Sequence, residues 1–224
     1  MEELVLRKDD NGLCTLILNR LDKLNSLNAD VFRQLRVHVE DQEKQVDTVG
    51  CVVLRGSGRC FSAGHDLGAI GAGESSADKR FQPEMVNRLA NLPQPVITAV
   101  HGHCYTGALE LALAGDIIIA ARSARFGDTH AKWALTPIWG MSQRLPRRIG
   151  VAKAKEMMFT AKMYTGEEAA AMGLANICVA DEDFDAEVEA MARSILANSW
   201  FSNRANKHLL EYTDGMSLHE GLRY

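Results

Sequence analysis

The sequence is short of the features that mark several large classes of protein. Its five cysteines are scattered and form no C-x-x-C pair, which argues against a disulfide framework and favours free, buried thiols. The net charge is −4, so no excess of positive charge favours nucleic acid or a membrane surface as a partner. The longest apolar runs, such as Ile117–Ala121, are far too short to span a bilayer.

The first residues also lack a targeting pattern. Met1-Glu2-Glu3-Leu4 is acidic and has neither the basic start nor the apolar run of a signal peptide. We therefore expect a cytoplasmic protein with no nucleic-acid and no membrane partner.

What the chain does contain is typical of a globular protein with a sizeable core. It has 224 residues, of which 46% are hydrophobic and 24% charged. This length suits one large domain, or a core with a small appendage. We predict a core over residues 1–180 and a helical C-terminal region over residues 181–224.

Strand and helix signals alternate along the core. Two short apolar runs, 4–7 and 14–19, flank Asn11-Gly12, which is a strong hairpin signal. Further strands are predicted at 51–54, 96–100, 117–120 and 177–179, and helices at 27–46, 81–90, 107–114, 185–197 and 204–212. The small, polar stretch 72–78 is predicted to be a loop. The alternation predicts an α/β fold with helical crossovers.

The last third of the chain reads as helical apart from residues 177–179. Capping-box patterns occur at Thr165-Gly166-Glu167-Glu168 and at Ser217-Leu218-His219-Glu220. The second pattern is followed by only four residues, although a stable helix needs several turns. We therefore expect a further C-terminal segment beyond Tyr224.

Two glycine-containing segments carry the chemical signal. Residues 58–67 read Gly-Arg-Cys-Phe-Ser-Ala-Gly-His-Asp-Leu, and residues 101–112 run from a strand through a turn into a helix. Glycine lets a ligand approach the backbone closely, and N–H groups at a helix start favour negative charge. Two such N–H groups directed at one oxygen would form an oxyanion hole.

Glu110 lies three residues after Gly107, in the first turn of the predicted helix. Helical side chains lean toward the N-terminus, so this carboxylate is expected beside whatever the Gly107 N–H binds. It would suit general acid–base catalysis there. A glutamate in a first turn also complements the helix dipole without any catalytic role, and spacing alone does not separate the two interpretations.

The two segments closely resemble the signature regions of the crotonase (enoyl-CoA hydratase/isomerase) family. Residues 62–67 resemble its first oxyanion motif, and residues 102–112 its second, with Gly107 and Glu110 in the family positions. Segments 19–27, 124–127, 143–145 and 165–174 also fit in order. The resemblance implies a spiral of ββα-type turns with a helical C-terminal region, and trimers or pairs of trimers that bind acyl-CoA thioesters.

The resemblance also implies roles for individual residues. The N–H groups of His65 and Gly107 would hold the thioester oxygen. The CoA part of the substrate would lie along a set of residues from two segments: Lys23, Leu24, Ala63, Gly64, Asp66 and Leu67.

The sequence departs from the family at three places. Hydratases of the family use a second glutamate, whose position here falls at His130; histidine titrates near neutral pH but is not equivalent to a carboxylate. Asp128 either orients His130, accepts a proton itself, or is a plain loop acid. Trp139 lies in a loop bulkier than the usual glycine-rich one and is expected to shape the acyl pocket. Gly68 replaces a basic residue that many members place near CoA.

The leading hypothesis is a hydratase that adds water to a 2-enoyl-CoA, with Glu110 activating the water and His130 assisting. The alternatives are an isomerase, hydrolase or lyase of the same family, or a non-catalytic acyl-CoA-binding protein. No metal and no redox cofactor is expected: His101 and His103 form an H-x-H pattern without an evident third ligand. A basic cluster at Arg144, Arg147 and Arg148 is predicted to be a solvated face, with a subunit contact or a nearby phosphate as the alternatives.

Overall fold

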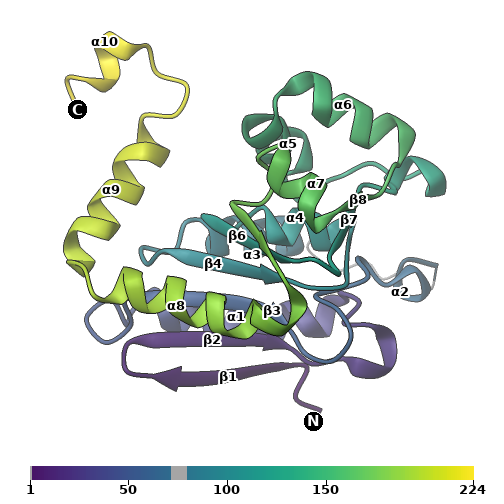
Figure 1. Cartoon of the computed structure of the whole chain (residues 1–224), viewed down its shortest axis with the longest axis horizontal. Coiled ribbons are helices and arrows are strands. Elements are labelled where there is room, and N and C mark those ends of the chain that lie inside the picture. Colours follow the sequence, from purple (N-terminus) through teal and green to yellow (C-terminus); the bar gives the residue numbers. More distant parts are fainter. Residues whose placement is uncertain (1, 72–79) are drawn as a thin grey trace.

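The computed structural model describes residues 2–71 and 80–224, and the loop predicted at 72–78 lies outside them. The main sheet has the strand order β1-β2-β3-β4-β6-β9, in which only the β1–β2 pair is antiparallel. Its strands are β1 (Val5–Asp10), β2 (Leu13–Leu18), β3 (Cys51–Gly56), β4 (Val96–Val100), β6 (Ile117–Ala121) and β9 (Ile177–Val179). Figure 1 shows β1 and β2 at the bottom of the molecule, with β4 and β6 above them.

A second, three-stranded sheet has the order β5-β7-β8. Its strands are β5 (His103–Tyr105), β7 (Arg125–Gly127) and β8 (Tyr164–Thr165). These strands are only two or three residues long and show no clear alternation, so the sequence did not predict them. The prediction that the last third is helical apart from residues 177–179 is therefore wrong at β8.

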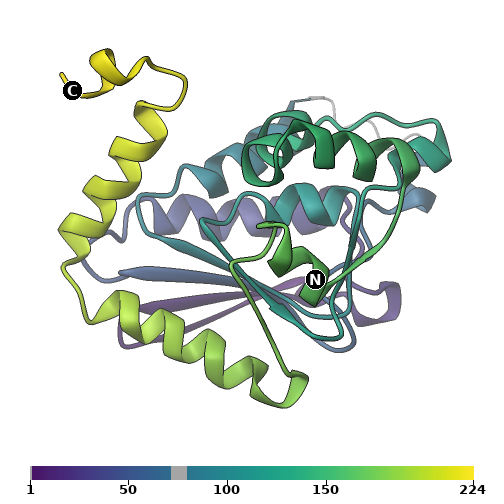
Figure 2. The same cartoon turned by 45° about the horizontal axis from the view of Figure 1, so that its top comes forward.

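Helices cover both faces of the main sheet (Figure 2). The α-helices are α1 (Ala29–Gln42), α2 (Leu67–Gly71), α3 (Phe81–Ala90), α4 (Gly107–Ala112), α5 (Met141–Ile149), α6 (Val151–Thr160), α7 (Gly166–Ala171), α8 (Phe184–Leu196), α9 (Trp200–Tyr212) and α10 (Leu218–Gly221). Short 3-10 helices are η1 (Leu21–Lys23), η2 (His130–Trp133) and η3 (Asp181–Asp183). The predicted helices and main-sheet strands are thus present, with ends that differ by a few residues.

Local sequence explains several of these elements. Asn11 and Gly12 both have positive φ, as the tight β1–β2 hairpin requires. Helix α1 begins after Asn28, whose side chain accepts a hydrogen bond from the Val31 N–H. Both predicted capping boxes form, at Thr165 before α7 and at Ser217 before α10. These are short-range interactions, which is why a sequence pattern predicts them.

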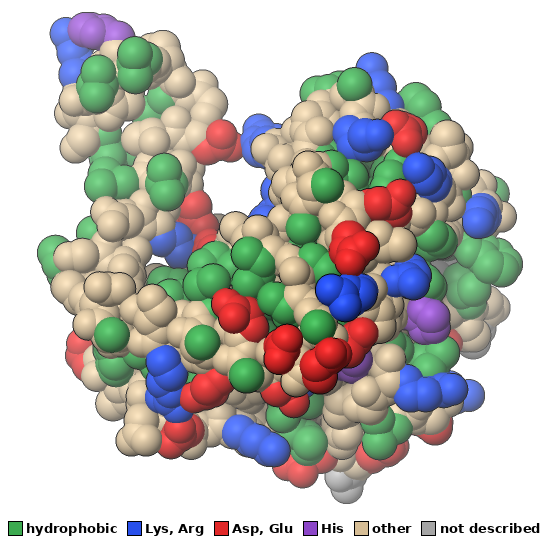
Figure 3. Space-filling view, viewed as in Figure 1, with side chains coloured by type: hydrophobic (Ala, Val, Ile, Leu, Met, Phe, Trp, Pro, Cys, Tyr) green, Lys and Arg blue, Asp and Glu red, His purple; other side chains and the backbone are tan. Residues whose placement is uncertain are grey.

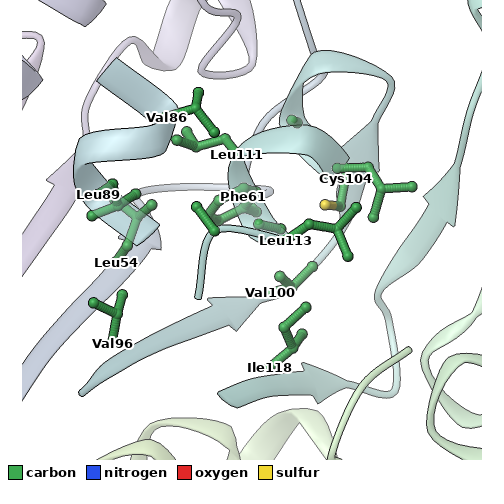
Figure 4. Packing of buried hydrophobic residues seen from close by; sticks show 14 of the residues in the cluster. Leu54, Phe61, Val86, Leu89, Val96, Val100, Cys104, Leu111, Leu113 and Ile118 are labelled. Atoms are coloured by element: carbon green, nitrogen blue, oxygen red, sulfur yellow. The ribbon is translucent and has the colours of Figure 1, made fainter. Parts of the chain in front are cut away.

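The core lies on both faces of the main sheet. The larger apolar cluster joins the sheet to α1, α3 and α4, and the smaller one joins its other face to α8. Figure 4 shows the larger cluster, with Val96 and Val100 of β4 across from Val86 and Leu89 of α3. Burial of these side chains fixes α4 against the sheet and so fixes the turn that precedes it.

The C-terminal region has two parts. Helix α8 packs on the sheet, whereas α9 and α10 form an arm that stands away from the body (Figures 1 and 2). In the space-filling view, a hollow lies between the arm and the α5–α6 region (Figure 3), and the ion pair of Arg147 in α5 with Asp214 after α9 bridges the two. Lys207 anchors the arm, because its Nζ donates to Asp116 Oδ2 at 2.8 Å while the side chain is buried. The boundary at residue 180 stays a prediction.

No helix in the described part of the chain is both long enough and apolar enough to cross a bilayer. None of the five cysteines is in a disulfide; four are buried and Cys178 is half-buried.

Candidate active site

The two glycine-containing segments lie side by side in the fold. Ser62 and Cys104 form a parallel β-bridge. The Phe61 N–H donates to the His101 carbonyl at 2.7 Å, and the Ser62 N–H donates to the His103 carbonyl at 2.9 Å. Segments that are forty residues apart in sequence therefore meet where the second one turns into α4.

Glycine is required on both sides of this meeting point. A Cβ on Gly64, whose φ is +105°, would lie 2.5 Å from the Tyr105 carbonyl oxygen. A Cβ on Gly107 would lie 2.5 Å from the Trp139 ring. Real Cβ atoms do not approach other heavy atoms so closely. Side chains are therefore excluded where the two segments and Trp139 come together.

Thr106, which directly precedes Gly107, has a backbone conformation rare for a β-branched residue. Its φ of 55° and ψ of −112° match the first central position of a type II′ turn, which glycine usually occupies. Its N–H donates to the Gly127 carbonyl at 2.8 Å, and its hydroxyl lies 2.6 Å from the Thr129 hydroxyl. Because ψ of residue 106 orients the next peptide, these contacts set the direction of the Gly107 N–H.

Glu110 lies one turn into α4 and is 1% exposed. Its Oε1 accepts hydrogen bonds from the Trp139 N–H at 2.7 Å and the Met141 N–H at 3.0 Å. Burial raises the pKa of this carboxyl to about 7, although the two N–H donors and nearby His130 act in the opposite direction. A carboxylate with a pKa near neutrality can both accept and release a proton at physiological pH.

His130 lies beside Glu110, and Asp128 lies beside His130, both in the segment that follows β7. His130 Nε2 lies 3.9 Å from Glu110 Oε2, and His130 Nδ1 lies 2.5 Å from Asp128 Oδ1. Asp128 is 1% exposed and His130 8% exposed. Of the three interpretations open for Asp128, the geometry favours the one in which it orients His130. The D-x-H spacing is the only sequence signal for this pair.

Trp139 closes the site on the side of α1. Its ring centroid lies 4.9 Å from that of His65 and 4.8 Å from that of Phe32. The residue is 2% exposed, and its buried indole N–H has no hydrogen-bond partner among the described residues. The ring therefore lies against both residues expected to supply the oxyanion N–H groups, His65 and Gly107.

Part of the predicted CoA segment is also brought together. The Leu24 carbonyl accepts a hydrogen bond from the Ala63 N–H at 2.9 Å, and Leu24 has a left-handed φ of 50°. Lys23 is exposed at the end of η1. Lys23 and Leu24 thus lie beside Ala63 of the first glycine segment, about forty residues further along the chain.

Asp66 and Leu67 occupy the start of α2. Asp66 Oδ2 lies 2.5 Å from Arg20 Nη1, and Asp66 Oδ1 accepts from the Gly68 N–H at 2.9 Å. The Arg20 hydrogen bond lowers the pKa of the Asp66 carboxyl. Leu67 is 45% exposed. The Asp66 carboxylate therefore binds groups of the protein itself, while the Leu67 side chain is exposed.

The arginine cluster was predicted to be a solvated face, and that prediction is wrong for two of its members. Arg144 Nη1 donates to the Trp139 carbonyl at 2.9 Å, and Arg148 Nη2 donates to the Gly115 carbonyl at 2.6 Å. Only Arg147 makes an exposed ion pair, with Asp214. Arg144 was missed as a neighbour of the site because nothing in its local sequence indicates that it reaches back to residue 139.

His101 and His103 do not converge on a common point. His101 Nε2 contacts the Gly58 carbonyl at 3.0 Å, and His103 Nδ1 contacts the Tyr105 hydroxyl at 2.8 Å. Among the described residues, no group of three His, Cys, Asp or Glu side chains is arranged to hold a metal ion.

The comparisons with known proteins agree with this geometry. A family model described as enoyl-CoA hydratase/isomerase matches residues 8–223. The chain belongs to the enoyl-CoA hydratase/isomerase family. As an enzyme of this family, it has the crotonase-like α/β fold that the resemblance implied.

Individual family members illustrate the match. The chain is 36% identical over 208 residues to 1,2-epoxyphenylacetyl-CoA isomerase of Escherichia coli, covering 90% of this chain and 79% of that one. It is 29% identical over 210 residues to short-chain-enoyl-CoA hydratase of Clostridium acetobutylicum, with 92% and 80% covered. The crystal structure of enoyl-CoA hydratase from Bacillus anthracis superposes with a TM-score of 0.92 at 29% identity, covering 98% of this chain and 87% of that one.

Proposed function

We propose that this protein is a hydratase, which adds water across the double bond of a 2-enoyl-CoA to give a 3-hydroxyacyl-CoA. The observation that carries the proposal is the buried Glu110 carboxylate, whose pKa is raised to about 7. It lies in the turn after Gly107 and opposite His130. A base poised near neutral pH beside a turn of backbone N–H groups suits proton transfer next to a polarised carbonyl.

In the proposed reaction the N–H groups of His65 and Gly107 bind the thioester oxygen. Glu110 takes a proton from water while the water oxygen bonds to C3, and the double-bond electrons move to the thioester oxygen as an enolate. Protonated His130 then gives the proton on Nε2 to C2, which restores the thioester carbonyl. Glu110 lies 3.9 Å from His130 Nε2, so its proton returns to His130 after a small approach of the two side chains.

The substrate would lie along the first glycine segment. Lys23, Leu24 and Ala63 are grouped there, with Gly64, Asp66 and Leu67 further along. Trp139 would bound the acyl group. Hydration is not a redox reaction, and the acid–base groups above account for each proton, so we propose no metal and no redox cofactor.

A double-bond isomerase is the second candidate. Isomerisation needs a single base that removes a proton from C2 of a 3-enoyl-CoA and returns it at C4. The histidine at the second position leaves Glu110 as the carboxylate available for such a shuttle. The family model, described as enoyl-CoA hydratase/isomerase, is consistent with either reaction.

Location and assembly complete the proposal. Five cysteines outside any disulfide support a reducing compartment, which we propose is the cytoplasm.

The arm carries four apolar side chains that are each at least 73% exposed: Phe201, Leu210, Leu218 and Leu222. Such apolar surface supports self-association, and from the family resemblance we propose a homotrimer or a dimer of trimers.

The test is turnover of a four-carbon 2-enoyl-CoA, followed by loss of the enoyl-thioester absorbance. We expect hydration by the wild type, no measurable hydration by Glu110→Gln, and a reduced kcat for His130→Ala. A wild type that binds the thioester without adding water would rule out the hydratase. Isomerisation of a 3-enoyl-CoA by that same protein would then support the second candidate.

A further inference from the structure

We propose that Asp128 is a positioning residue that fixes the ring orientation and tautomer of His130, and so makes Nε2 the proton-transferring atom. The inference rests on the proposed function, in which His130 exchanges a proton with the substrate. It deepens that function by assigning a role to a buried carboxylate that does not itself face the reacting atoms.

Asp128 holds His130 at two points. Its Oδ1 accepts from the His130 backbone N–H at 3.1 Å and lies 2.5 Å from the ring Nδ1. Because the two residues are only two positions apart, one carboxylate oxygen fixes both the local backbone and the ring. With 1% of Asp128 exposed, little water competes for that oxygen.

This contact determines which ring nitrogen faces the site. An ionised carboxylate only accepts hydrogen bonds, so the short contact requires a proton on His130 Nδ1. Nε2 is then the nitrogen directed at Glu110 Oε2, 3.9 Å away. The same negative charge stabilises the imidazolium that the reaction requires, as a carboxylate does for histidine in other acid–base sites.

The neighbouring segment holds the pair in place. Thr129, between the two residues, contacts the Thr106 hydroxyl at 2.6 Å, and Gly127 accepts from the Thr106 N–H at 2.8 Å. Asp128 and His130 are thus attached to the turn that leads into Gly107. The orientation of His130 Nε2 relative to the thioester oxygen is therefore set within one connected unit.

The charge arrangement also explains why histidine suits this position. A glutamate at position 130 would place a third carboxylate beside Glu110 and Asp128, all of them buried. Like charges in a buried site oppose one another strongly. A His130→Glu variant, which restores the usual family glutamate, is therefore expected to be active only if the Asp128 charge is removed as well.

The first experiment is a double-mutant cycle in the full chain, with kcat and KM measured for the four-carbon enoyl-CoA. Asp128→Asn should lower kcat roughly 10- to 100-fold, the usual effect of losing such an outer partner, with little change in KM. In a His130→Gln background, Asp128→Asn should lower kcat by less than about twofold, because no imidazole ring remains to be oriented. Asp185→Asn, an exposed acid paired with Arg55, is the matched control.

Equal losses in both backgrounds would mean that Asp128 acts on the fold generally, and the proposal would be overturned. The second test is restoration. His130→Glu should be nearly inactive, and adding Asp128→Asn should raise its kcat at least about tenfold. No gain from the second change would also contradict the proposal.

A readout independent of turnover separates this proposal from the proposed function. Nitrogen NMR of ¹⁵N-histidine-labelled protein reports which ring nitrogen of His130 carries the proton. We expect Nδ1 to carry a proton in the wild type both in the imidazolium and in the neutral ring, and the neutral ring of Asp128→Asn to be a mixture of tautomers. A neutral wild-type ring whose proton lies on Nε2 would overturn the proposal even if the enzyme is a hydratase. An Nδ1–H form in a protein that hydrates nothing would leave the positioning role intact and remove only the hydratase.

Discussion

Glu110 should destabilise the folded protein at neutral pH, and replacing it with glutamine should stabilise the fold while removing activity. The glutamine Oε1 can still accept the hydrogen bonds from the Trp139 and Met141 N–H groups, so the local structure is retained. What the substitution removes is a negative charge in a buried position. The gain in stability should therefore depend on pH.

The magnitude follows from the pKa of Glu110. The rise from 4.5 to about 7, at about 1.36 kcal/mol for each pKa unit, corresponds to about 3 kcal/mol of unfolding free energy. Because the folded-state pKa of Glu110 is higher than its unfolded-state pKa, the neutral carboxyl contributes this free energy in full below pH 4.5. The wild type loses the contribution as the pH rises through 7. Near its midpoint a chain of this size changes its Tm by roughly 2–4 °C for each kcal/mol.

The assay is urea unfolding of wild type and Glu110→Gln at half-unit steps from pH 5 to pH 8.5. We expect the difference in unfolding free energy to widen in favour of the variant up to about pH 7 and then to level off. Glu182→Gln, on the exposed η3, should differ from wild type by less than about 0.5 kcal/mol throughout. A difference that stays constant with pH, or that favours the wild type at pH 8, would refute the buried-charge argument.

Three further predictions concern the reaction and the pocket. The kcat/KM for hydration should fall as the pH drops below about 7, because Glu110 must be ionised to accept a proton; a flat profile from pH 5.5 to 8.5 would contradict this. Thr106→Ala should lower kcat by roughly tenfold or more, because the Gly107 N–H is then misdirected. Thr106→Gly should keep most of the wild-type kcat, because glycine adopts positive φ freely. Equal kcat in the two variants would exclude this orienting role. Trp139→Ala should lower the unfolding free energy by about 3–5 kcal/mol. It should also raise the ratio of kcat/KM for an eight-carbon to that for a four-carbon enoyl-CoA. An unchanged ratio would show that the ring does not bound the acyl group.

Local sequence determined much of the fold because the interactions concerned are short-range. The Asn11-Gly12 hairpin and the capping boxes at Thr165 and Ser217 each depend on residues within four positions of one another. The central strands β3 and β4 are apolar apart from Arg55 and Thr98, as is typical of parallel strands covered on both faces. The family resemblance then pointed to Glu110, in the second glycine segment, and to His130 beyond it as the residues to examine.

Tertiary structure alone decided how those residues are arranged. The contact of Ser62 with Cys104 and the approach of Trp139 to Gly107 join segments thirty or more residues apart, and no local pattern encodes such distances. The pKa of Glu110 depends on burial, which arises only when α4 packs beneath the 139–141 loop. The sequence by itself therefore determined which chemical groups are present, while the packing determined their protonation and their orientation, because desolvation and long-range contacts exist only in the folded chain.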